Sequence, residues 1–274
     1  MLIVGELLNT SCLKHGQKII EQAIIARDAA TISDIARRQH TAGADYLDIN
    51  AGTLGDAEPE ALAWLTTVVQ QTVPAPICFD SPTPAALSGA LRVYRRENGQ
   101  PMINSISAGT ASYAVILPLV RAYQAKVIAL AIDDDGISTD PAKRHAVACK
   151  LVERLTADDV PLADIYLDPL TFPLGSVPDA ARSLLALIAQ LRAEFPGLHT
   201  IAGFSNISHG LPARRLLNQA LVLLALGSGI DAGILDPTDR HLMGLIAATE
   251  ALFGREESCR RYIDRARAGT FYGI

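Results

Sequence analysis

Cysteines are few and widely spaced in this chain of 274 residues. The four of them are Cys12, Cys78, Cys149 and Cys259, and no two form a Cys-x-x-Cys pair. This spacing argues against a zinc-binding motif and against the disulfide framework of a small secreted domain. We therefore expect reduced thiols in a cytoplasmic protein, with no bound metal.

Positive charge is also scarce, and the sequence lacks long hydrophobic runs. Lys and Arg number 24 against 29 Asp and Glu, which gives a net charge of −5 at pH 7, and no basic run occurs. This balance argues against a nucleic-acid partner. No uncharged apolar stretch reaches the ~20 residues that a membrane span needs. Residues 1–5 do not begin a signal peptide, so we expect neither membrane insertion nor secretion.

What the chain does have is a regular alternation of two kinds of segment. Its hydrophobic fraction of 49% suffices for one large core. Short, nearly continuous apolar segments predict the strands of a parallel sheet that is buried on both faces. The predicted strands are Leu2–Asn9, Tyr46–Asn50, Pro76–Ser81, Met102–Ser107, Lys126–Asp133, Asp164–Leu170, Thr200–Ser208 and Ala232–Thr238.

Amphipathic segments lie between the predicted strands. Pro59 and Pro84 each stand where a first helical turn is expected, a position that proline favours. The predicted helices are Ser33–Thr41, Pro59–Gln71, Pro84–Arg96, Ala111–Gln124, Pro141–Leu155, Ala180–Phe195, Pro212–Leu226 and Arg240–Phe253. Eight strand–helix units in about 250 residues predict an α/β fold, the (β/α)8 TIM barrel. An open, doubly wound sheet is the alternative, although it rarely contains eight units.

One more amphipathic segment, at about residues 256–267, follows the eighth unit and predicts an extra C-terminal helix. No linker, low-complexity segment or break in composition divides the chain. We therefore expect residues 1–274 to form a single barrel domain.

Polar side chains stand at the carboxyl end of every predicted strand, where TIM barrels carry their active sites. These side chains are carboxylates, amides and hydroxyls, and none is Lys or Arg. Such a ring suits a neutral heterocycle rich in hydrogen-bonding groups rather than a phosphorylated sugar. The strand ends contain Glu6, Asn9, Asp48, Asn50, Asp80, Asn104, Ser105, Asp133, Asp168, Ser205, Asn206 and Asp236.

The apolar run of residues 199–208 is the most informative of these segments because it delivers Asn206, whose amide carries two donors and an acceptor. Asp48 and Asn50 are two residues apart, so both face the same side of a strand. A carboxylate such as Asp48 suits a 2-amino-pyrimidinone, whose exocyclic amine and ring N–H are adjacent donors. A plain turn-closing role remains open for Asn206 and for Asp168.

Six short motifs stand in order at matching strand ends over nearly the whole chain. They are Gly5-Glu6-x-x-Asn9, Leu47-Asp48-Ile49-Asn50-Ala51-Gly52, Phe79-Asp80-Ser81, Ile103-Asn104-Ser105, Leu167-Asp168-Pro169-Leu170 and Gly203-Phe204-Ser205-Asn206-Ile207-Ser208. Together they resemble the pterin-binding methyltransferases, which are the methyltetrahydrofolate:corrinoid methyltransferases, and the folate domain of cobalamin-dependent methionine synthase. The resemblance implies a pterin-binding TIM barrel that is dihydropteroate synthase-like, and a homodimer.

The resemblance also implies roles for single residues. In that family, the residues that match Asp80, Asn104 and Asp168 hold the pterin ring. The residue that matches Asn206 reaches N5, the nitrogen that carries the methyl group, and is therefore the expected catalytic residue. The other residues expected at the pterin are Glu6, Asp48, Asn50 and Ser205. Those expected at the folate tail are Arg214 and His209, which stands where the nearest relatives are expected to have Gln.

The activity implied is methyl transfer between N5 of methyltetrahydrofolate, or tetrahydrofolate, and the cobalt of a corrinoid. Losing a methyl group leaves a poor amine anion at N5 unless that nitrogen gains a proton or a strong hydrogen bond. An interaction that strengthens only as this charge develops accelerates the reaction. The corrinoid is expected on a partner protein or as cobalamin in solution.

Asp239-Arg240-His241-Leu242-Met243-Gly244 matches the D-x-H-x-x-G pattern of corrinoid-binding domains. Such a domain needs ~100 residues around the motif, and only 30 follow Gly244. We therefore predict that the motif begins the eighth helix, with Asp239 near its N-terminus.

Two other functions remain open. A dihydropteroate synthase would have the same fold and pterin pocket, but it must anchor a pyrophosphate, and Thr200–Ser208 offers no Lys or Arg. A catalytically silent, folate-binding subunit of a corrinoid complex is the second alternative, against which the presence of Asn206 argues.

Overall fold

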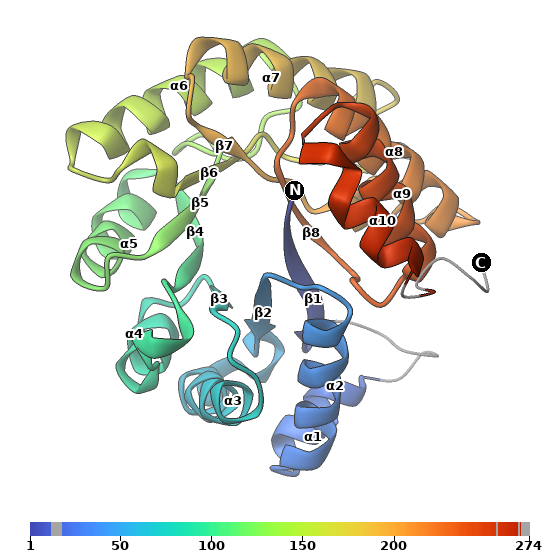
Figure 1. Cartoon of the computed structure of the whole chain (residues 1–274). Helices are drawn as coiled ribbons and strands as arrows, with labels where there is room; N and C mark the ends of the chain where they lie inside the picture. The colour runs from blue at the N-terminus through green and yellow to red at the C-terminus, as the bar shows by residue number, and fades with distance from the viewer. Residues whose placement is uncertain (12–17, 256, 268, 270–274) are drawn as a thin grey trace.

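Eight parallel strands form a nearly closed barrel surrounded by helices in the computed structural model (Figure 1), which describes residues 1–11, 18–255, 257–267 and 269. The strand order is β7-β6-β5-β4-β3-β2-β1-β8. A parallel bridge between Gly203 and Ile234 joins the two ends of this sheet. The predicted (β/α)8 TIM barrel is confirmed, and the open sheet is excluded. The strands are β1 (Leu2–Asn9), β2 (Tyr46–Asn50), β3 (Ile77–Asp80), β4 (Met102–Ser107), β5 (Lys126–Leu130), β6 (Ile165–Asp168), β7 (His199–Thr200) and β8 (Ala232–Leu235).

The helices follow the predicted order, with one addition near the N-terminus. Helix α1 was not predicted, and α2 begins at Ala29 rather than Ser33 because the Asp28 side chain caps it by accepting from the backbone N–H groups of Ala30 and Thr31. The helices are α1 (Ile19–Ile25), α2 (Ala29–Thr41), α3 (Glu58–Thr72), α4 (Pro84–Val93), α5 (Thr110–Ala122), α6 (Pro141–Ala157), α7 (Ala180–Glu194), α8 (Arg214–Ser228), α9 (Arg240–Leu252) and α10 (Arg260–Arg267).

Helix α10 lies where the extra C-terminal helix was predicted, and it packs against α9 (Figure 1). A short 3-10 turn, Glu257–Cys259, precedes it. Residue 256, the predicted start, lies outside the described residues. In the part of the chain that the structure describes, no helix has both the length and the apolar character needed to span a membrane.

The seventh strand is much shorter than predicted. Only His199–Thr200 pairs with β6, and Phe204–Asn206 forms a 3-10 turn. The local chain uses the backbone carbonyls that a strand would offer to its neighbours: the His209 N–H donates to the Asn206 carbonyl at 3.1 Å, and the Arg214 guanidinium donates to the Ser205 carbonyl at 2.8 Å. The prediction of a strand over Thr200–Ser208 was therefore wrong beyond its first residue.

The barrel interior consists of layers set by the alternation of side chains along a strand. One layer is apolar and contains Val4, Tyr46, Cys78, Met102, Ile128, Tyr166, Ile201 and Ala232. Residues two positions further along face inward again, toward the carboxyl ends of the strands. That next layer contains Glu6, Asp48, Asp80, Asn104, Leu130, Asp168, Gly203 and Ile234. The barrel mouth thus has an apolar floor below a layer rich in carboxylates.

Candidate active site at the barrel mouth

Glu6 stands at the mouth end of β1, next to a glycine that packs closely against α2. A Cβ atom on Gly5 would lie 2.5 Å from Oε1 of Gln39, so a side chain at position 5 would displace the Gln39 amide. The same Gln39 oxygen accepts from the Leu7 N–H at 3.0 Å, beside an irregularity in the pairing of β1 with β2. Burial raises the pKa of Glu6 to about 7, while a 2.9 Å hydrogen bond from the Ser205 hydroxyl lowers it.

Asp80, at the end of β3, is held by two amides. The Nδ2 atoms of Asn50 and Asn9 donate to its Oδ2 at 3.0 and 3.4 Å. Burial raises the pKa of Asp80 to about 6, although the hydrogen bond from Asn50 opposes the shift. Among the described residues no donor reaches Oδ1, so this oxygen is available to a ligand N–H.

Asp48 lies deeper, with 2% of its surface exposed. Burial raises its pKa well above the ordinary value, and the charge of Asp80 adds to that effect. The Nδ2 atom of Asn104 donates to Oδ1 of Asp48 at 3.5 Å. The neighbouring buried carboxylates of Asp48 and Asp80 disfavour each other's negative charge. A ligand that donates hydrogen bonds to both would therefore relieve their repulsion.

Asp168 closes a turn and also faces the barrel interior. Its Oδ1 accepts from the Leu170 N–H at 2.8 Å, which is the turn role that the sequence had left open. Burial is the main cause that raises the pKa of Asp168 to about 6. No described residue donates to Oδ2, so the same side chain retains an acceptor for a ligand.

Arg144, which the sequence analysis missed, fixes the backbone after Asp168. It is 1% exposed, and its Nη1 donates to the carbonyls of Pro169 and Leu170 at 3.0 and 3.1 Å. Its place in the first turn of α6 was a usable signal, because a cation is unfavourable at the positive end of a helix dipole unless it has another role.

Ser205 and Asn206 lie on the 3-10 turn that follows β7. Asn206 is exposed, and its side chain makes no hydrogen bond with any residue that the structure describes. The Arg214 guanidinium braces this turn by donating to the Ser205 carbonyl and, at 3.1 Å, to the Ser208 hydroxyl. The side chain of Asn206 is therefore unengaged on a segment that is itself held in place.

The structure brings most of the predicted site residues into two sets and leaves Asn206 and His209, both exposed, outside them. Asp48, Asn50, Asp80 and Asn104 share contacts at the ends of β2, β3 and β4, and Asp168 occupies the same interior layer from β6. A cavity of about 690 Å³ between α8 and α9 is lined by a further set that includes Glu6, Ser205, Arg214, Arg215, Asp236 and Arg240.

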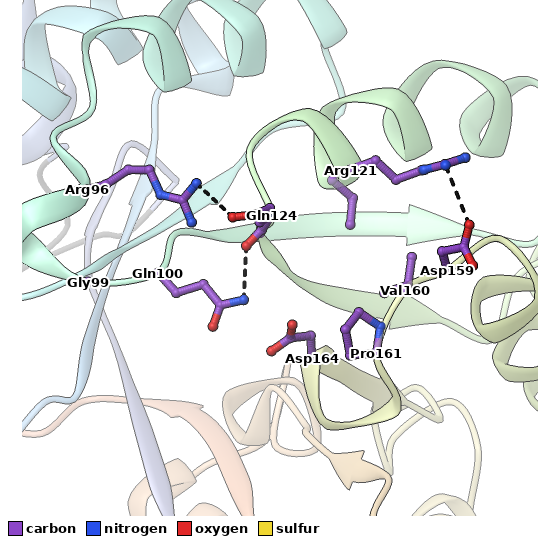
Figure 2. A pocket seen from close by; sticks show the side chains of 11 residues that line it. Arg96, Gly99, Gln100, Arg121, Gln124, Asp159, Val160, Pro161 and Asp164 are labelled. Atoms are coloured by element: carbon purple, nitrogen blue, oxygen red, sulfur yellow. Dashed lines mark hydrogen bonds and ion pairs between the residues drawn. The ribbon is translucent and has the colours of Figure 1, made fainter.

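A second cavity, of about 610 Å³, lies at the opposite end of the barrel, near the beginnings of β4, β5 and β6 (Figure 2). It contains none of the predicted site residues. Its charged and amide groups pair with one another: Arg96 with Gln124 at 3.2 Å, and Arg121 with Asp159 at 3.6 Å. The candidate active site is therefore the mouth rather than this cavity.

Comparison with known proteins shows the family to which the chain belongs. The family of pterin binding enzymes matches residues 8–236. The methylcorrinoid:tetrahydrofolate methyltransferase of Eubacterium limosum is 34% identical over 271 residues, which cover 98% of this chain and 97% of that protein. The methionine synthase of Mycobacterium tuberculosis is 28% identical over 246 residues, which cover 85% of this chain but 20% of that longer protein.

Solved structures support the fold alone, since their sequences are distant. A dihydropteroate synthase of Yersinia pestis with a sulfonamide drug has a TM-score of 0.71 at 14% identity, covering 93% of this chain and 94% of that one. The synthase of Xanthomonas albilineans with 7,8-dihydropteroate has a TM-score of 0.67 at 18% identity, covering 90% and 93%. The resemblance first seen in the six motifs is confirmed: the chain belongs to the family of pterin-binding enzymes, and its full-length similarity is to a methyltransferase.

Proposed function

We propose that this enzyme transfers a methyl group between N5 of tetrahydrofolate and the cobalt of a corrinoid that a partner protein carries. The observation that carries the proposal is the 34% identity over 98% of the chain with a relative named for this reaction. The mouth supports it chemically. Asp48, Asp80 and Asp168 present acceptors for the N–H donors of a pterin, and Asn206 offers an unengaged amide.

N5 gains or loses a proton during the reaction, and this suits neighbouring side chains that donate hydrogen bonds without carrying a permanent charge. When methyltetrahydrofolate gives its methyl group to Co(I), the N5–C bond breaks, a Co–C bond forms, and N5 takes up a proton. In the reverse direction, the N5 lone pair attacks the methyl group, and N5 loses a proton. We infer that the Asn206 amide hydrogen-bonds N5 as charge changes there, with Glu6 and Ser205 beside it.

One assay distinguishes this function from both alternatives. Purified protein is mixed with methyltetrahydrofolate and reduced cobalamin, and the cobalt absorbance is followed in time. Conversion of Co(I) to methyl-Co(III) supports the proposal, while folate binding without conversion indicates a silent subunit. A parallel mixture of dihydropterin pyrophosphate and p-aminobenzoate tests for the synthase, whose activity we expect to be absent because Thr200–Ser208 contains no Lys or Arg to anchor the pyrophosphate.

Folate affinity should fall in acid because the carboxylate acceptors at the mouth become protonated in an accessible pH range. The pKa values of Asp80 and Asp168 are both raised to about 6. Below pH 6 protonation removes acceptors, so affinity should drop by about tenfold per pH unit for each proton that binding must displace. Calorimetric titration between pH 5 and pH 8 measures this slope, and Asp168→Asn should flatten it.

The unliganded fold should respond to acid with the opposite sign. An acid whose pKa is higher in the folded than in the unfolded state binds protons preferentially when folded, so lowering the pH from 6 toward 4 favours folding at these sites. Urea unfolding at the same pH values distinguishes a loss of binding from a loss of structure.

The chain itself should not bind a corrinoid tightly. Asp239 caps α9 by accepting from the Leu242 N–H, and it is held by Arg215 and Gln219. His241 contacts Gln219 at 3.1 Å. The Asp and His side chains of the D-x-H-x-x-G motif are thus engaged in contacts within the barrel wall and are not available to a corrinoid. We expect no cobalamin to copurify and His241→Ala to retain methyl transfer; stoichiometric cobalamin on the purified protein would contradict this.

We further propose that residues 1–274 act as one pterin-binding domain, that the folate tail extends toward Arg214, and that the enzyme works as a cytoplasmic homodimer. Arg214 and Arg240 lie along the cavity beside Glu6, and their charge suits the carboxylates of a glutamate tail. Sedimentation analysis of the purified protein tests the dimer.

A further inference from the structure

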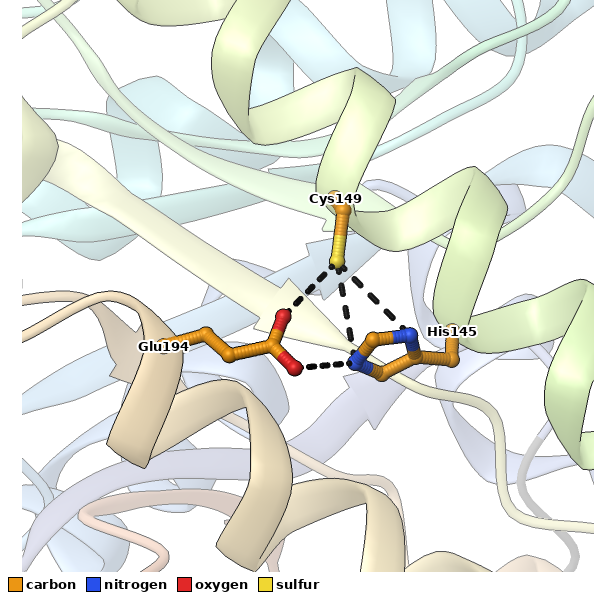
Figure 3. A group of neighbouring side chains, drawn as sticks. All are labelled: His145, Cys149 and Glu194. Atoms are coloured by element: carbon orange, nitrogen blue, oxygen red, sulfur yellow. Dashed lines mark hydrogen bonds and ion pairs between the residues drawn. The ribbon is translucent and has the colours of Figure 1, made fainter.

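Three metal-ligating side chains converge on the outer wall of the barrel, away from the mouth. His145 and Cys149 stand one helical turn apart on α6, so both project from the same face. Glu194, the last residue of α7, points at them from the neighbouring helix (Figure 3). The ligand atoms of all three residues lie within 4.8 Å of one another.

The distances between these atoms are close to the edges of a tetrahedron around one ion, with Cys149 and His145 each facing a different oxygen of Glu194. Cys149 Sγ lies 3.7 Å from His145 Nε2 and 3.3 Å from Glu194 Oε2, and Nε2 lies 3.1 Å from Oε1. Bonds of about 2.0 Å to N and O and about 2.3 Å to S, at tetrahedral angles, give edges of about 3.3–3.6 Å. A rotation of the Glu194 carboxylate that turns one oxygen toward both Cys149 and His145 would complete the coordination.

The charges around the thiol also favour a cation. The carboxylates of Glu194 and Glu153 both lie near the Cys149 thiol. Glu153 is one turn beyond Cys149 on the same helix. The side chains of His145 and Glu194 are 27% and 48% exposed, so an ion from solvent can reach the site.

A catalytic Cys–His–Glu triad does not fit this geometry. In such a triad the histidine uses one ring nitrogen for the nucleophile and the other for the carboxylate. Here Nε2 is the ring nitrogen nearest to Cys149 and also the one paired with Glu194. The thiol itself donates to Glu194, which makes it a poor nucleophile. Convergence of all three groups on one point is what an ion requires.

We propose that His145, Cys149 and Glu194 bind a divalent zinc-like ion that links α6 to α7. Thiolate, imidazole and carboxylate are together the ligand types of Zn²⁺. Three protein ligands leave a fourth position for water. The wide spacing of the cysteines along the sequence predicted no metal site. This site escapes that argument because it uses one cysteine, and because Glu194 is 45 residues from Cys149.

Titration of the metal-free full-length protein with Co²⁺, a spectroscopic probe for zinc sites, tests the proposal without folate or corrinoid. We expect one equivalent to bind, with the visible bands of a tetrahedral site and a thiolate-to-cobalt charge-transfer band. Cys149→Ser should abolish that band and weaken binding by at least ~100-fold, since outer-shell changes alone cost ~10–100-fold. Its hydroxyl can still donate to Glu194, so the helices should remain packed.

Cys259→Ser is the matched control, because it removes an exposed thiol outside the cluster and should leave the spectrum unchanged. Zn²⁺ should raise the melting temperature of the wild type and of this control, but not that of Cys149→Ser. Failure of Co²⁺ to give the charge-transfer band, or its persistence in Cys149→Ser, would overturn the proposal. Methyl transfer by Cys149→Ser should equal that of the wild type, which keeps this test separate from the proposed activity.

Discussion

Replacement of Asn206 by alanine is expected to slow methyl transfer roughly 10²–10³-fold, the scale of deleting one preorganised hydrogen-bond donor. Folate affinity should fall much less. The Asn206 side chain makes no hydrogen bond in the described structure, so its removal leaves no buried partner unsatisfied. Its expected contribution arises only when charge changes at N5, and an interaction confined to the transition state affects the rate constant rather than ground-state binding.

Two measurements on the same preparation decide this: folate affinity by fluorescence quenching, and single-turnover methyl transfer to Co(I) by absorbance. Asn206→Asp is an informative companion, since it keeps the size and removes the amide donors. Asn98→Ala controls for the loss of an amide in general, because Asn98 lies on the 3-10 turn that precedes β4, at the opposite end of the barrel from the mouth. Equal losses in rate and affinity would make Asn206 an ordinary binding residue, and no loss in either would leave it a residue that only closes a turn.

Asp168→Asn and Asp80→Asn should each weaken folate binding by about 1.5–3 kcal/mol, the scale of a hydrogen bond to a charged group, or roughly 10–150-fold. The structure explains why the substitution should act on the ligand rather than on the fold. In Asp168→Asn the remaining oxygen can still accept from the Leu170 N–H, and in Asp80→Asn it can still accept from Asn50. The new NH₂ group then faces the donors of the pterin.

Asp164→Asn is the matched control for this pair. Asp164 directly precedes β6, at the opposite end from Asp168, where it lies 3.7 Å from Lys126. Calorimetric titration should give wild-type affinity for the control and weaker binding for both mouth variants. Wild-type affinity in Asp168→Asn and Asp80→Asn would remove these residues from the pterin site.

The periodicity of the sequence was sufficient for the fold because alternation along strands and the spacing of the units are local properties. It was also sufficient to place Glu6, Asp48, Asp80, Asn104 and Asp168 at the carboxyl ends of the strands, and the structure adds that the five share one interior layer. The periodicity could not predict contacts between segments that are far apart in the sequence. The seventh strand was drawn too long because the Arg214 guanidinium, nine residues from Ser205, helps to turn the chain.

Arg144 and the His145–Cys149–Glu194 cluster escaped prediction for the same reason. Each depends on how α6 packs against its neighbours: Arg144 reaches the backbone after β6 and the Ser183 hydroxyl on α7, at 3.1 Å. A pattern within α6 records that a cation, an imidazole and a thiol are present. It does not record what faces them, because that is decided by the packing of whole helices.

The closure of the ring between β7 and β8 has a consequence for how the protein opens. The backbone joins these edges by one bridge and one hydrogen bond, from Ile234 to the Ala202 carbonyl at 3.0 Å. Asp231 adds side-chain contacts to Thr200 and His199 before β8 begins, whereas the other neighbouring strands share longer backbone ladders. Local separation should therefore start here. A folate held by Asp168 on one side and Glu6 on the other would add its binding free energy to the cost of that separation. The exchange rate of the Ile234 amide hydrogen would then report on occupancy of the mouth.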